Sequence, residues 1–322
     1  MNLTSILQIW LFLTFTKIDG SPHHNYPQVN REDLIRNLVK KHRKNLLENP
    51  NQHPSDLDKS EPVRTGPNRT ACTEVYFRNS NTSIPRTIIT SFPGSGNTWM
   101  RHLIHMATGF HTGSVYNDNK LVAQGFKGET LAWNDNRTVG VKMHQFGSAS
   151  KLAHKHGVTA VKLFPKTLLL IRNPFRAILS EFNRLNNRGH SHTGEADEKL
   201  FHDGTFLEYF GKQLPRWGRS IAKWINEYQG EVQSVCYERM KEETMDVVKK
   251  SIEFMEVPFA RPRCIKKSKL SHGSFKRVSK HVDITEMIKD EPKLKKMADL
   301  VLQGVSNMLK RKNLEDCTEY FE

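Results

Sequence analysis

The sequence is short of cysteine, of long hydrophobic runs and of acidic residues, and each shortage narrows the possibilities. Its four cysteines include no Cys-x-x-Cys pair, which argues against a structural zinc site. The apolar run at residues 6–15 is about half the length that a membrane-spanning helix needs. The chain has only 34 acidic residues but 49 Lys and Arg residues, which gives a net charge of +15. That surplus favours an anionic partner: nucleic acid, acidic polysaccharide, a membrane surface or a phosphorylated cofactor.

The rest of the composition is that of an ordinary globular protein. With 37% hydrophobic and 26% charged residues, the chain is neither wholly disordered nor collagen-like. Its 322 residues suffice for one large domain or two modest ones, either of which buries a substantial core.

The N-terminal segment has the features of a targeting signal. The apolar run at 6–15 is followed by a small residue, Gly20, and then by polar sequence. We interpret residues 1–20 as a secretory signal peptide, although no Lys or Arg precedes the run. A short signal anchor is the alternative, and membrane contact is expected only if the segment stays uncleaved. Three Asn-x-Ser/Thr sites that follow this segment favour a secretory-pathway location, in the Golgi lumen or secreted, with glycosylation at Asn68, Asn81 and Asn136.

Residues 21–84 are expected to form a stem or linker. Six of the fourteen prolines lie between residues 21 and 70, among many Asn, Ser and His residues. Within this stretch, apolar residues recur at helical spacing over 34–46, which predicts one amphipathic helix packed on the main domain or on a partner.

An oxidising compartment permits disulfide bonds, but the sequence leaves three full pairings of the four cysteines open. Our expectation is a bridge between Cys264 and Cys317. Cys236 lies in a strand-like run and is expected to be a buried free thiol.

From about residue 85, short β-rich runs alternate with helix-like segments. This alternation, with apolar strands, is typical of an α/β fold with a parallel sheet covered on both faces. The expected strands are 86–90, 139–143, 167–171 and 232–237, and the expected helices are 98–107, 175–185, 206–228 and 241–254. In the long helix, Trp217 and Trp224 are seven residues apart and are expected to share a buried face.

The first expected strand runs directly into a loop of small residues at 91–99, and a helix pattern follows. Gly94 and Gly96 allow a tight turn, so that backbone N–H groups of residues 95–98 can bind an anion at the helix N-terminus. The loop lacks the Gly-Lys-Ser/Thr ending of a P-loop, because Asn97 stands where the lysine would be. That substitution argues against a nucleotide kinase. An ordinary tight turn is the alternative.

A second strand, turn and helix occupies residues 168–180. Arg172 closes the strand, Pro174 suits a helix start, and Ser180 follows one to two turns later. Because ligands of open α/β sheets bind at the carboxyl ends of the strands, both turns are expected to face one crevice. An Arg that merely caps a sheet edge is the alternative for this motif alone.

The two motifs together, SFPGSGNTW and IRNPFRAILS, resemble the cofactor signatures of the sulfotransferases that use 3′-phosphoadenosine-5′-phosphosulfate (PAPS). The resemblance implies a P-loop-like three-layer sandwich, with a central parallel sheet flanked by helices, over residues 85–322. It implies that the second motif, through Arg172 and Ser180, holds the 3′-phosphate. The first motif, counted as Gly94, Ser95, Gly96, Asn97 and Thr98, is implied to hold the 5′ side.

Weaker matches follow in the family's order along the chain. Lys142-Met-His144 resembles the family's Lys-Thr-His, whose His is the catalytic base, and Tyr237-Glu-Arg-Met-Lys resembles a motif whose Tyr lies by the adenine. Trp99 matches a Trp near the same base. A basic C-terminal segment resembles the one near the 3′-phosphate, which implies roles for Lys269, Lys276 and Arg277. The motif sequences, including GFKGE at 125–129, are most similar to those of animal members that carry WSC domains, although no WSC domain is visible here.

The residues suit sulfuryl transfer, which proceeds like phosphoryl transfer through a loose in-line displacement. His144 has an ordinary pKa suited to a general base, and Lys142 can stabilise charge on the transferring group. Many soluble members have Lys where Gly94 stands here, so we name Lys142 and Arg101 as candidate substitutes.

The resulting hypothesis is a PAPS-dependent enzyme that modifies a hydroxyl of a glycan or another secretory-pathway acceptor. No metal is required, and His102 with His105 lacks a third ligand. Nucleic acid is disfavoured by the secretory signal. The acceptor pocket is expected in the variable loops 108–135 and 186–204, where His190 and His192 lie. A weak or inactive relative that binds acidic polysaccharide is the alternative, and the acceptor and the oligomeric state stay open.

Overall fold

The computed structural model describes residues 72–81, 83–187, 194–266 and 282–321. The chain divides into two compact units, residues 1–62 and 63–322. All described residues belong to the second unit. The expected signal segment and the amphipathic helix at 34–46 therefore lie outside the described residues. Within the described residues, no helix is both long enough and apolar enough to cross a bilayer.

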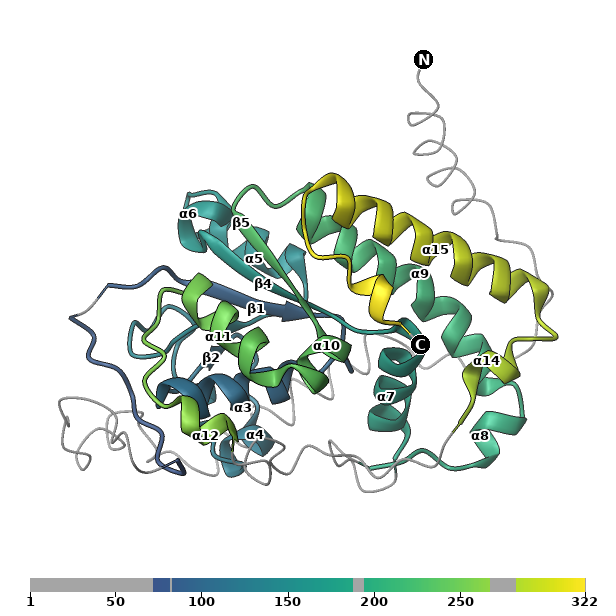
Figure 1. The fold of residues 1–322 in the computed structure, drawn as a ribbon, viewed down its shortest axis with the longest axis horizontal. Coiled ribbons are helices and arrows are strands. Elements are labelled where there is room, and N and C mark those ends of the chain that lie inside the picture. The colour runs from purple at the N-terminus through teal and green to yellow at the C-terminus, as the bar shows by residue number, and fades with distance from the viewer. Residues whose placement is uncertain (1–71, 82, 188–193, 267–281, 322) are drawn as a thin grey trace, which may run out of the picture. The chain divides into compact units, whose positions relative to one another are not determined.

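Five parallel strands form one sheet (Figure 1). They are β1 (Thr87–Ser91), β2 (Gly113–Ser114), β3 (Val141–Lys142), β4 (Lys166–Ile171) and β5 (Glu231–Cys236). The order across the sheet is β2-β3-β1-β4-β5, and Ile88 of β1 pairs with Val141 on one side and Thr167 on the other. The four expected strands are confirmed, and the two-residue β2 was not expected.

The apolar sequences of β1 and β4 explain the layers. Every residue of these two strands is buried, and successive side chains point to opposite faces. Ile88 and Leu169 belong to one apolar cluster, whereas Ile89 and Leu168 belong to a second. A sheet with an apolar core on each face must be covered by helices on both sides. The predicted three-layer α/β sandwich is therefore confirmed.

Helices cover the two faces and connect the strands. The longer ones are α3 (Asn97–Thr108), α5 (Phe146–Lys155), α7 (Pro174–Asn186), α9 (Thr205–Asn226), α11 (Thr244–Phe254) and α15 (Pro292–Arg311). The shorter ones are α4 (Asn119–Ala123), η2 (Lys127–Thr130), α6 (Ala160–Leu163), α8 (Lys199–His202), α10 (Tyr237–Glu242), α12 (Pro262–Lys266), α14 (Ile284–Met287) and η3 (Cys317–Tyr320).

Helices α9 and α15 pack side by side (Figure 1). Trp217 and Trp224 of α9 are fully buried in the core, as their spacing predicted. On the neighbouring face of α9, a Cβ added at Gly218 would lie 2.9 Å from a methyl of Val301. The glycine therefore permits the close approach of α15.

The disulfide expectation is wrong on both counts. The bridges are Cys72–Cys264 and Cys236–Cys317, so Cys236 is not a free thiol and Cys264 does not pair with Cys317. Cys264 lies in α12, which packs on α3, whereas Cys317 lies in η3 beside β5. The two expected partners, Cys264 and Cys317, therefore lie in different parts of the fold, and each forms a disulfide with another cysteine nearby.

Candidate active site

The loop after β1 forms a cradle at the start of α3. Gly94 and Gly96 have φ values of 80° and 86°, in the left-handed region that favours glycine. Gly96 caps α3 without a side-chain hydrogen bond, and the first turn of α3 carries no acidic residue. The N–H groups and dipole of this helix end are thus available to an anion.

Both glycines also lack the space for a side chain. A Cβ at Gly94 would lie 2.2 Å from the carbonyl oxygen of Ala177 in α7. A Cβ at Gly96 would lie 2.5 Å from the ring of Tyr237. The loop is therefore pressed between α7 and Tyr237, which brings the two sequence motifs together.

Several buried polar atoms in this cradle have no hydrogen-bond partner within the described part of the chain. They are Ser95 Oγ, Asn97 Oδ1 and Arg172 Nε. The other side-chain atom of Asn97, Nδ2, donates to the carbonyl of Ile89 at 3.0 Å and so fixes the amide. Because an unpaired buried polar atom costs free energy, such a group of them indicates a polar ligand.

Arg172 connects the loop to the aromatic residues. Its Nη1 donates to the Gly94 carbonyl at 2.6 Å, and its guanidinium carbon lies 4.3 Å from the ring centre of Tyr237. Tyr237 in turn meets Trp99 edge to face, with ring centres 5.6 Å apart. Ser180 lies on α7 next to Glu181, whose backbone borders Gly94. The structure thus gathers these predicted cofactor residues in one place.

Glu238 joins this cluster and was not singled out from the sequence. Its Oε1 accepts a hydrogen bond from the backbone N of Asn173 at 3.1 Å, while Oε2 is buried without a partner in the described chain. Burial raises the pKa of the Glu238 carboxyl. The only signal in the sequence was its place directly after Tyr237.

His144 lies beyond the end of β3 and is held by the end of β1. Its Nδ1 is 2.8 Å from the carbonyl oxygen of Ser91. Since a carbonyl only accepts, Nδ1 carries the hydrogen of the neutral ring, and Nε2 keeps its lone pair. Burial, with the charge of the nearby Lys142, lowers the pKa of His144 to about 4. The imidazole is therefore neutral at pH 7 and able to accept a proton.

Lys142, on β3, is only 8% exposed. Burial, with the charge of Arg101, lowers the pKa of its ammonium to about 8. Its Nζ lies 5.5 Å from the ring centre of Tyr116. Lys142 is thus a desolvated but still charged cation beside His144 at neutral pH.

Tyr116 also contacts the pair and was not predicted. Its hydroxyl accepts a hydrogen bond from the backbone N of His144 at 2.7 Å, and the two rings are 5.5 Å apart. It lies in the segment 108–135 that was expected to line the acceptor pocket. No residue pattern in the sequence distinguished it from its neighbours.

Arg101 does not replace the ammonium that Gly94 lacks. It is fully buried, and its Nη1 pairs with Glu129 Oε1 at 2.5 Å. Its Nε donates to Thr112 Oγ1 at 2.8 Å. Arg101 therefore supports the loop 112–129 instead of facing the cradle, and Lys142 remains the candidate substitute.

Other predicted residues lie elsewhere. Asn81 and Asn136 are exposed, and their glycosylation stays a prediction. His105 is buried and bonded to Thr112, and no group of three potential metal ligands occurs among the described residues. The residues outside the described part are Asn68, His190, His192, Lys269, Lys276 and Arg277.

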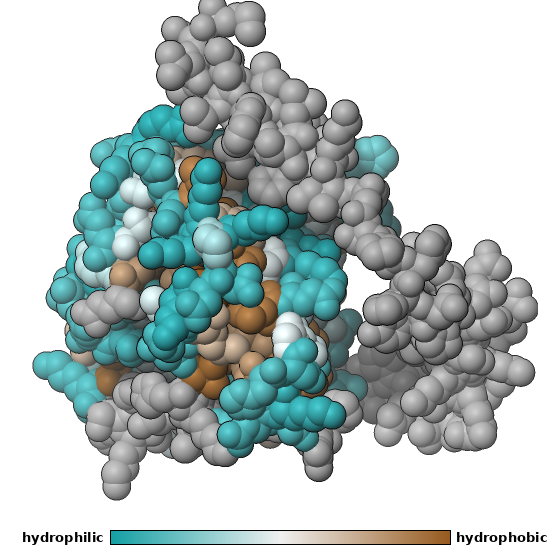
Figure 2. All heavy atoms as spheres, turned by 90° about the vertical axis from the view of Figure 1, so that its right-hand side faces the viewer, coloured by the Kyte–Doolittle hydropathy of each residue, from teal (hydrophilic) through white to brown (hydrophobic). Residues whose placement is uncertain are grey.

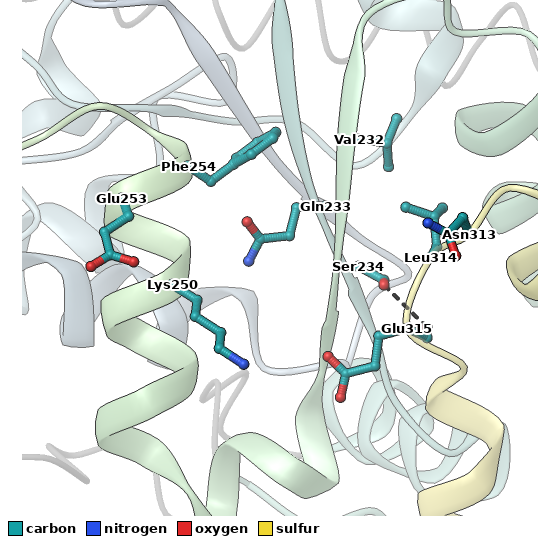
Figure 3. A pocket seen from close by; sticks show the side chains of 9 residues that line it. All are labelled: Val232, Gln233, Ser234, Lys250, Glu253, Phe254, Asn313, Leu314 and Glu315. Atoms are coloured by element: carbon teal, nitrogen blue, oxygen red, sulfur yellow. Dashed lines mark hydrogen bonds between the residues drawn. The ribbon is translucent and has the colours of Figure 1, made fainter.

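A separate pocket of about 500 Å³ lies along β5 (Figure 3). Gln233 and Ser234 of β5, Lys250 of α11 and Glu315 line it, and none of the predicted site residues does. Ser234 Oγ donates to the Glu315 carbonyl across it. The pocket is therefore distinct from the cradle.

The side of the molecule that carries α8 and α14 has apolar residues gathered among hydrophilic ones (Figure 2). Helix α8 lies in the described part of the second expected acceptor loop, 186–204. Phe201 of α8 packs on Phe182 of α7 and Phe206 of α9. Helix α8 is therefore anchored to α7, the helix that also borders the cradle.

The model of the sulfotransferase domain family matches residues 85–321, and the chain belongs to this family. The resemblance seen in the motifs is thereby confirmed. Within the family, a WSCD family member of Aedes aegypti is 34% identical over 173 residues, which cover 53% of this chain and 50% of that protein. A WSCD family member of Drosophila melanogaster is 32% identical over the same shares. The chain thus spans about half the length of the curated relatives it matches.

A crystal structure of mouse sulfotransferase SULT7A1 complexed with PAP is also similar to this chain. It is 13% identical, with a TM-score of 0.47, and the match covers 77% of this chain and 91% of that one.

Proposed function

We propose that this chain transfers the sulfuryl group of PAPS to a hydroxyl of a glycan or another secretory-pathway acceptor, with His144 as the general base. The observation that carries this proposal is the bond from His144 Nδ1 to the Ser91 carbonyl. It leaves Nε2 as the basic atom at the carboxyl edge of the sheet, beside the loop that begins at Ser91.

The cradle fits the cofactor. The N-terminus of α3 and the unpaired Ser95 hydroxyl suit the 5′-phosphosulfate, with Gly94, Gly96, Asn97 and Thr98 forming the rest of the turn. Arg172 and Ser180 suit the 3′-phosphate, and Trp99 with Tyr237 offers an aromatic surface for the adenine. When bound, PAPS supplies an activated sulfuryl group with a good leaving group.

The chain's own contribution is a proton acceptor and a fixed positive charge. A neutral His144 takes the proton from the acceptor hydroxyl, a role typically worth about 10²–10⁴-fold in rate. A charged Lys142 stabilises negative charge on the oxygens that surround the transferred group. Since Lys142 is largely desolvated, that stabilisation is stronger than in water. We therefore interpret Gly94 as a variant of the mechanism and not as a loss of activity.

The disulfides are consistent with the proposed location. The Cys236–Cys317 bridge lies inside the family domain, and the Cys72–Cys264 bridge joins the domain to the segment before it. Disulfides persist in oxidising compartments such as the secretory pathway.

The test separates binding from catalysis. Thermal shift and calorimetry with the desulfated nucleotide PAP measure binding, and transfer of radiolabelled sulfate to a panel of glycans measures activity. His144→Ala should bind PAP as the wild type does and lose about 10²–10⁴-fold in kcat. Arg172→Ala should lose PAP affinity. A wild type that is not stabilised by PAP would contradict the proposal.

A second candidate function is that of a weak or inactive relative that binds acidic polysaccharide. It is favoured by the net charge of +15 and by the absence of Lys at Gly94. It predicts salt-sensitive heparin binding that His144→Ala leaves unchanged, with no sulfate transfer by the wild type.

A further inference from the structure

Tyr116 contacts both members of the proposed catalytic pair. Its hydroxyl accepts from the backbone N of His144 at 2.7 Å, and its ring lies at 33° to the imidazole. The same ring is 5.5 Å from Lys142 Nζ. With 42% of its surface exposed, Tyr116 stands between this pair and the solvent.

The segment that carries Tyr116 is tied at both ends to one buried ion pair. Arg101 holds the start, because its Nε donates to Thr112 Oγ1 and its Nη2 to the Thr112 carbonyl. Glu129 holds the other end, because its Oε2 accepts from the backbone N of Asp118 at 3.1 Å. Arg101 and Glu129 are joined to each other, and both side chains are fully buried.

The sequence GFKGE at residues 125–129 is shaped to reach this pair. A Cβ at Gly128 would lie 2.2 Å from the Thr112 carbonyl oxygen, so only glycine permits the approach. The buried ring of Phe126 lies 4.8 Å from the guanidinium carbon of Arg101. A buried ion pair is often no more stabilising than apolar residues of similar volume. We therefore attribute the Arg101–Glu129 pair to the segment that it holds in place and not to a gain in stability.

We propose that Tyr116 is a positioning residue for His144: its hydroxyl fixes the backbone of the base, its ring shields the imidazole from water, and the Arg101–Glu129 pair holds Tyr116 in place. The inference deepens the proposed function and rests on it, because it assigns Tyr116 to the same base.

The shielding has a measurable consequence. The groups in contact with His144 are the carbonyl and hydroxyl of Ser91 and the side chain of Tyr116. The charges of Lys142, Arg101 and Arg184 also act on its ring. Burial is the largest cause of the lowered pKa of His144, and the three cations act in the same direction. Removal of the ring admits water, so the pKa should move toward the ordinary value of about 6.5.

The first experiment uses Tyr116→Phe, which deletes the hydroxyl and keeps the ring. Loss of the hydroxyl leaves the His144 backbone N–H without this partner, so kcat should fall about tenfold while KM for PAPS stays unchanged. The melting temperature should fall by only a few degrees, as in any variant that loses one hydrogen bond. The matched control is Tyr320→Phe in η3, which removes a hydroxyl bonded to Glu315 and should leave kcat unchanged. An unchanged kcat in Tyr116→Phe would overturn the role of the hydroxyl.

The second experiment needs no activity. The pKa of His144 is measured by NMR titration of the nucleotide-free protein, with its signal assigned through His144→Ala. Tyr116→Ala should raise that pKa by about one unit or more above the wild-type value, and Tyr320→Phe should not. An unshifted pKa would overturn the shielding. If the wild type transfers no sulfate, the proposed function fails, and this titration still decides whether Tyr116 shields His144.

Discussion

His144 and Lys142 have pKa values displaced in the same direction for the same reason. Each loses solvent around its charged form, and each has other cations nearby. The displacements, to about 4 and about 8, leave the histidine neutral and the lysine charged at pH 7. These are the protonation states that a base and an electrostatic stabiliser require.

The activity should therefore depend on pH with two limbs. His144 must be unprotonated, so kcat/KM should rise as the pH increases through about 4. Lys142 must be protonated, so kcat/KM should fall as the pH increases through about 8. Initial rates between pH 3.5 and 10, at about constant ionic strength, measure both limbs, because kcat/KM reports the free enzyme.

Lys142→Arg is the control for the upper limb. An arginine stays charged up to about pH 12, so the fall near pH 8 should disappear while the lower limb stays in place. A lower limb near pH 6.5 would contradict the burial of His144, and an upper limb unmoved by Lys142→Arg would exclude Lys142 as its source.

Gly94 is held in place by two separate constraints, and Gly94→Ala should violate both. Its φ of 80° strains any other residue by about 1–2 kcal/mol. Its missing Cβ also leaves room for the Ala177 carbonyl, so a methyl would push α7 away from the loop. Thermal unfolding and PAP calorimetry should show a lower melting temperature together with lost PAP affinity.

Gly157→Ala supplies the comparison, because Gly157 has a φ of 64° and open space around its Cβ position. That variant should show the strain alone and bind PAP normally. If the two substitutions changed the melting temperature and the PAP affinity equally, the contact between Gly94 and α7 would not be needed for PAP binding.

At the scale of elements, the sequence predicted what local residue types determine. The loop at Gly94 and Gly96 and the helix start at Pro174 carry residues whose backbone preferences are strong on their own. The helix α15 has a comparable signal, Pro292 at its first position and apolar residues at helical spacing, so it could have been found.

Other features depend on tertiary contacts and had no local signal. The strand β2 has two residues and exists because it pairs with β3. The expected helix at 241–254 is instead α10 and α11, divided at Glu243, where neither Gly nor Pro marks a break. Tyr116 gains its place only through the fold around Arg101. Disulfide pairing likewise follows from which layer holds each cysteine.

The Cys236–Cys317 bridge ties the C-terminal η3 to the end of β5, directly before Tyr237. Its removal in Cys236→Ser/Cys317→Ser should cost about 2–4 kcal/mol of stability. It should also weaken PAP binding, because the backbone before Tyr237 loses its anchor. Denaturant unfolding and calorimetry below the transition measure the two effects.

The matched comparison is Cys72→Ser/Cys264→Ser, which removes the covalent link between α12 and Cys72. That pair should lose stability and retain PAP affinity in the same assays. A Cys236→Ser/Cys317→Ser protein that binds PAP as tightly as the wild type would show that Tyr237 needs no support from η3.

At the scale of the whole molecule, the candidate site lies where the carboxyl ends of the parallel strands meet. Ser91 ends β1, Arg172 follows β4 and Tyr237 follows β5, so three strands deliver residues to one edge. This arrangement is the general one for ligands of open α/β sheets. The site uses few of the cations that make the chain basic, and the remaining positive charge belongs to the field of the whole molecule.

That field should act on the encounter with PAPS and not on the chemical step. A charge of +15 attracts a polyanionic nucleotide over a range set by the Debye length, about 30 Å at 0.01 M salt and about 8 Å at 0.15 M. The KM for PAPS should therefore rise severalfold over that range of salt. Within the site, the charge of Lys142 is largely desolvated and is screened little by salt, so kcat should stay constant. A salt effect confined to kcat would contradict this division, and an acceptor whose own KM rises in parallel would itself be an anion.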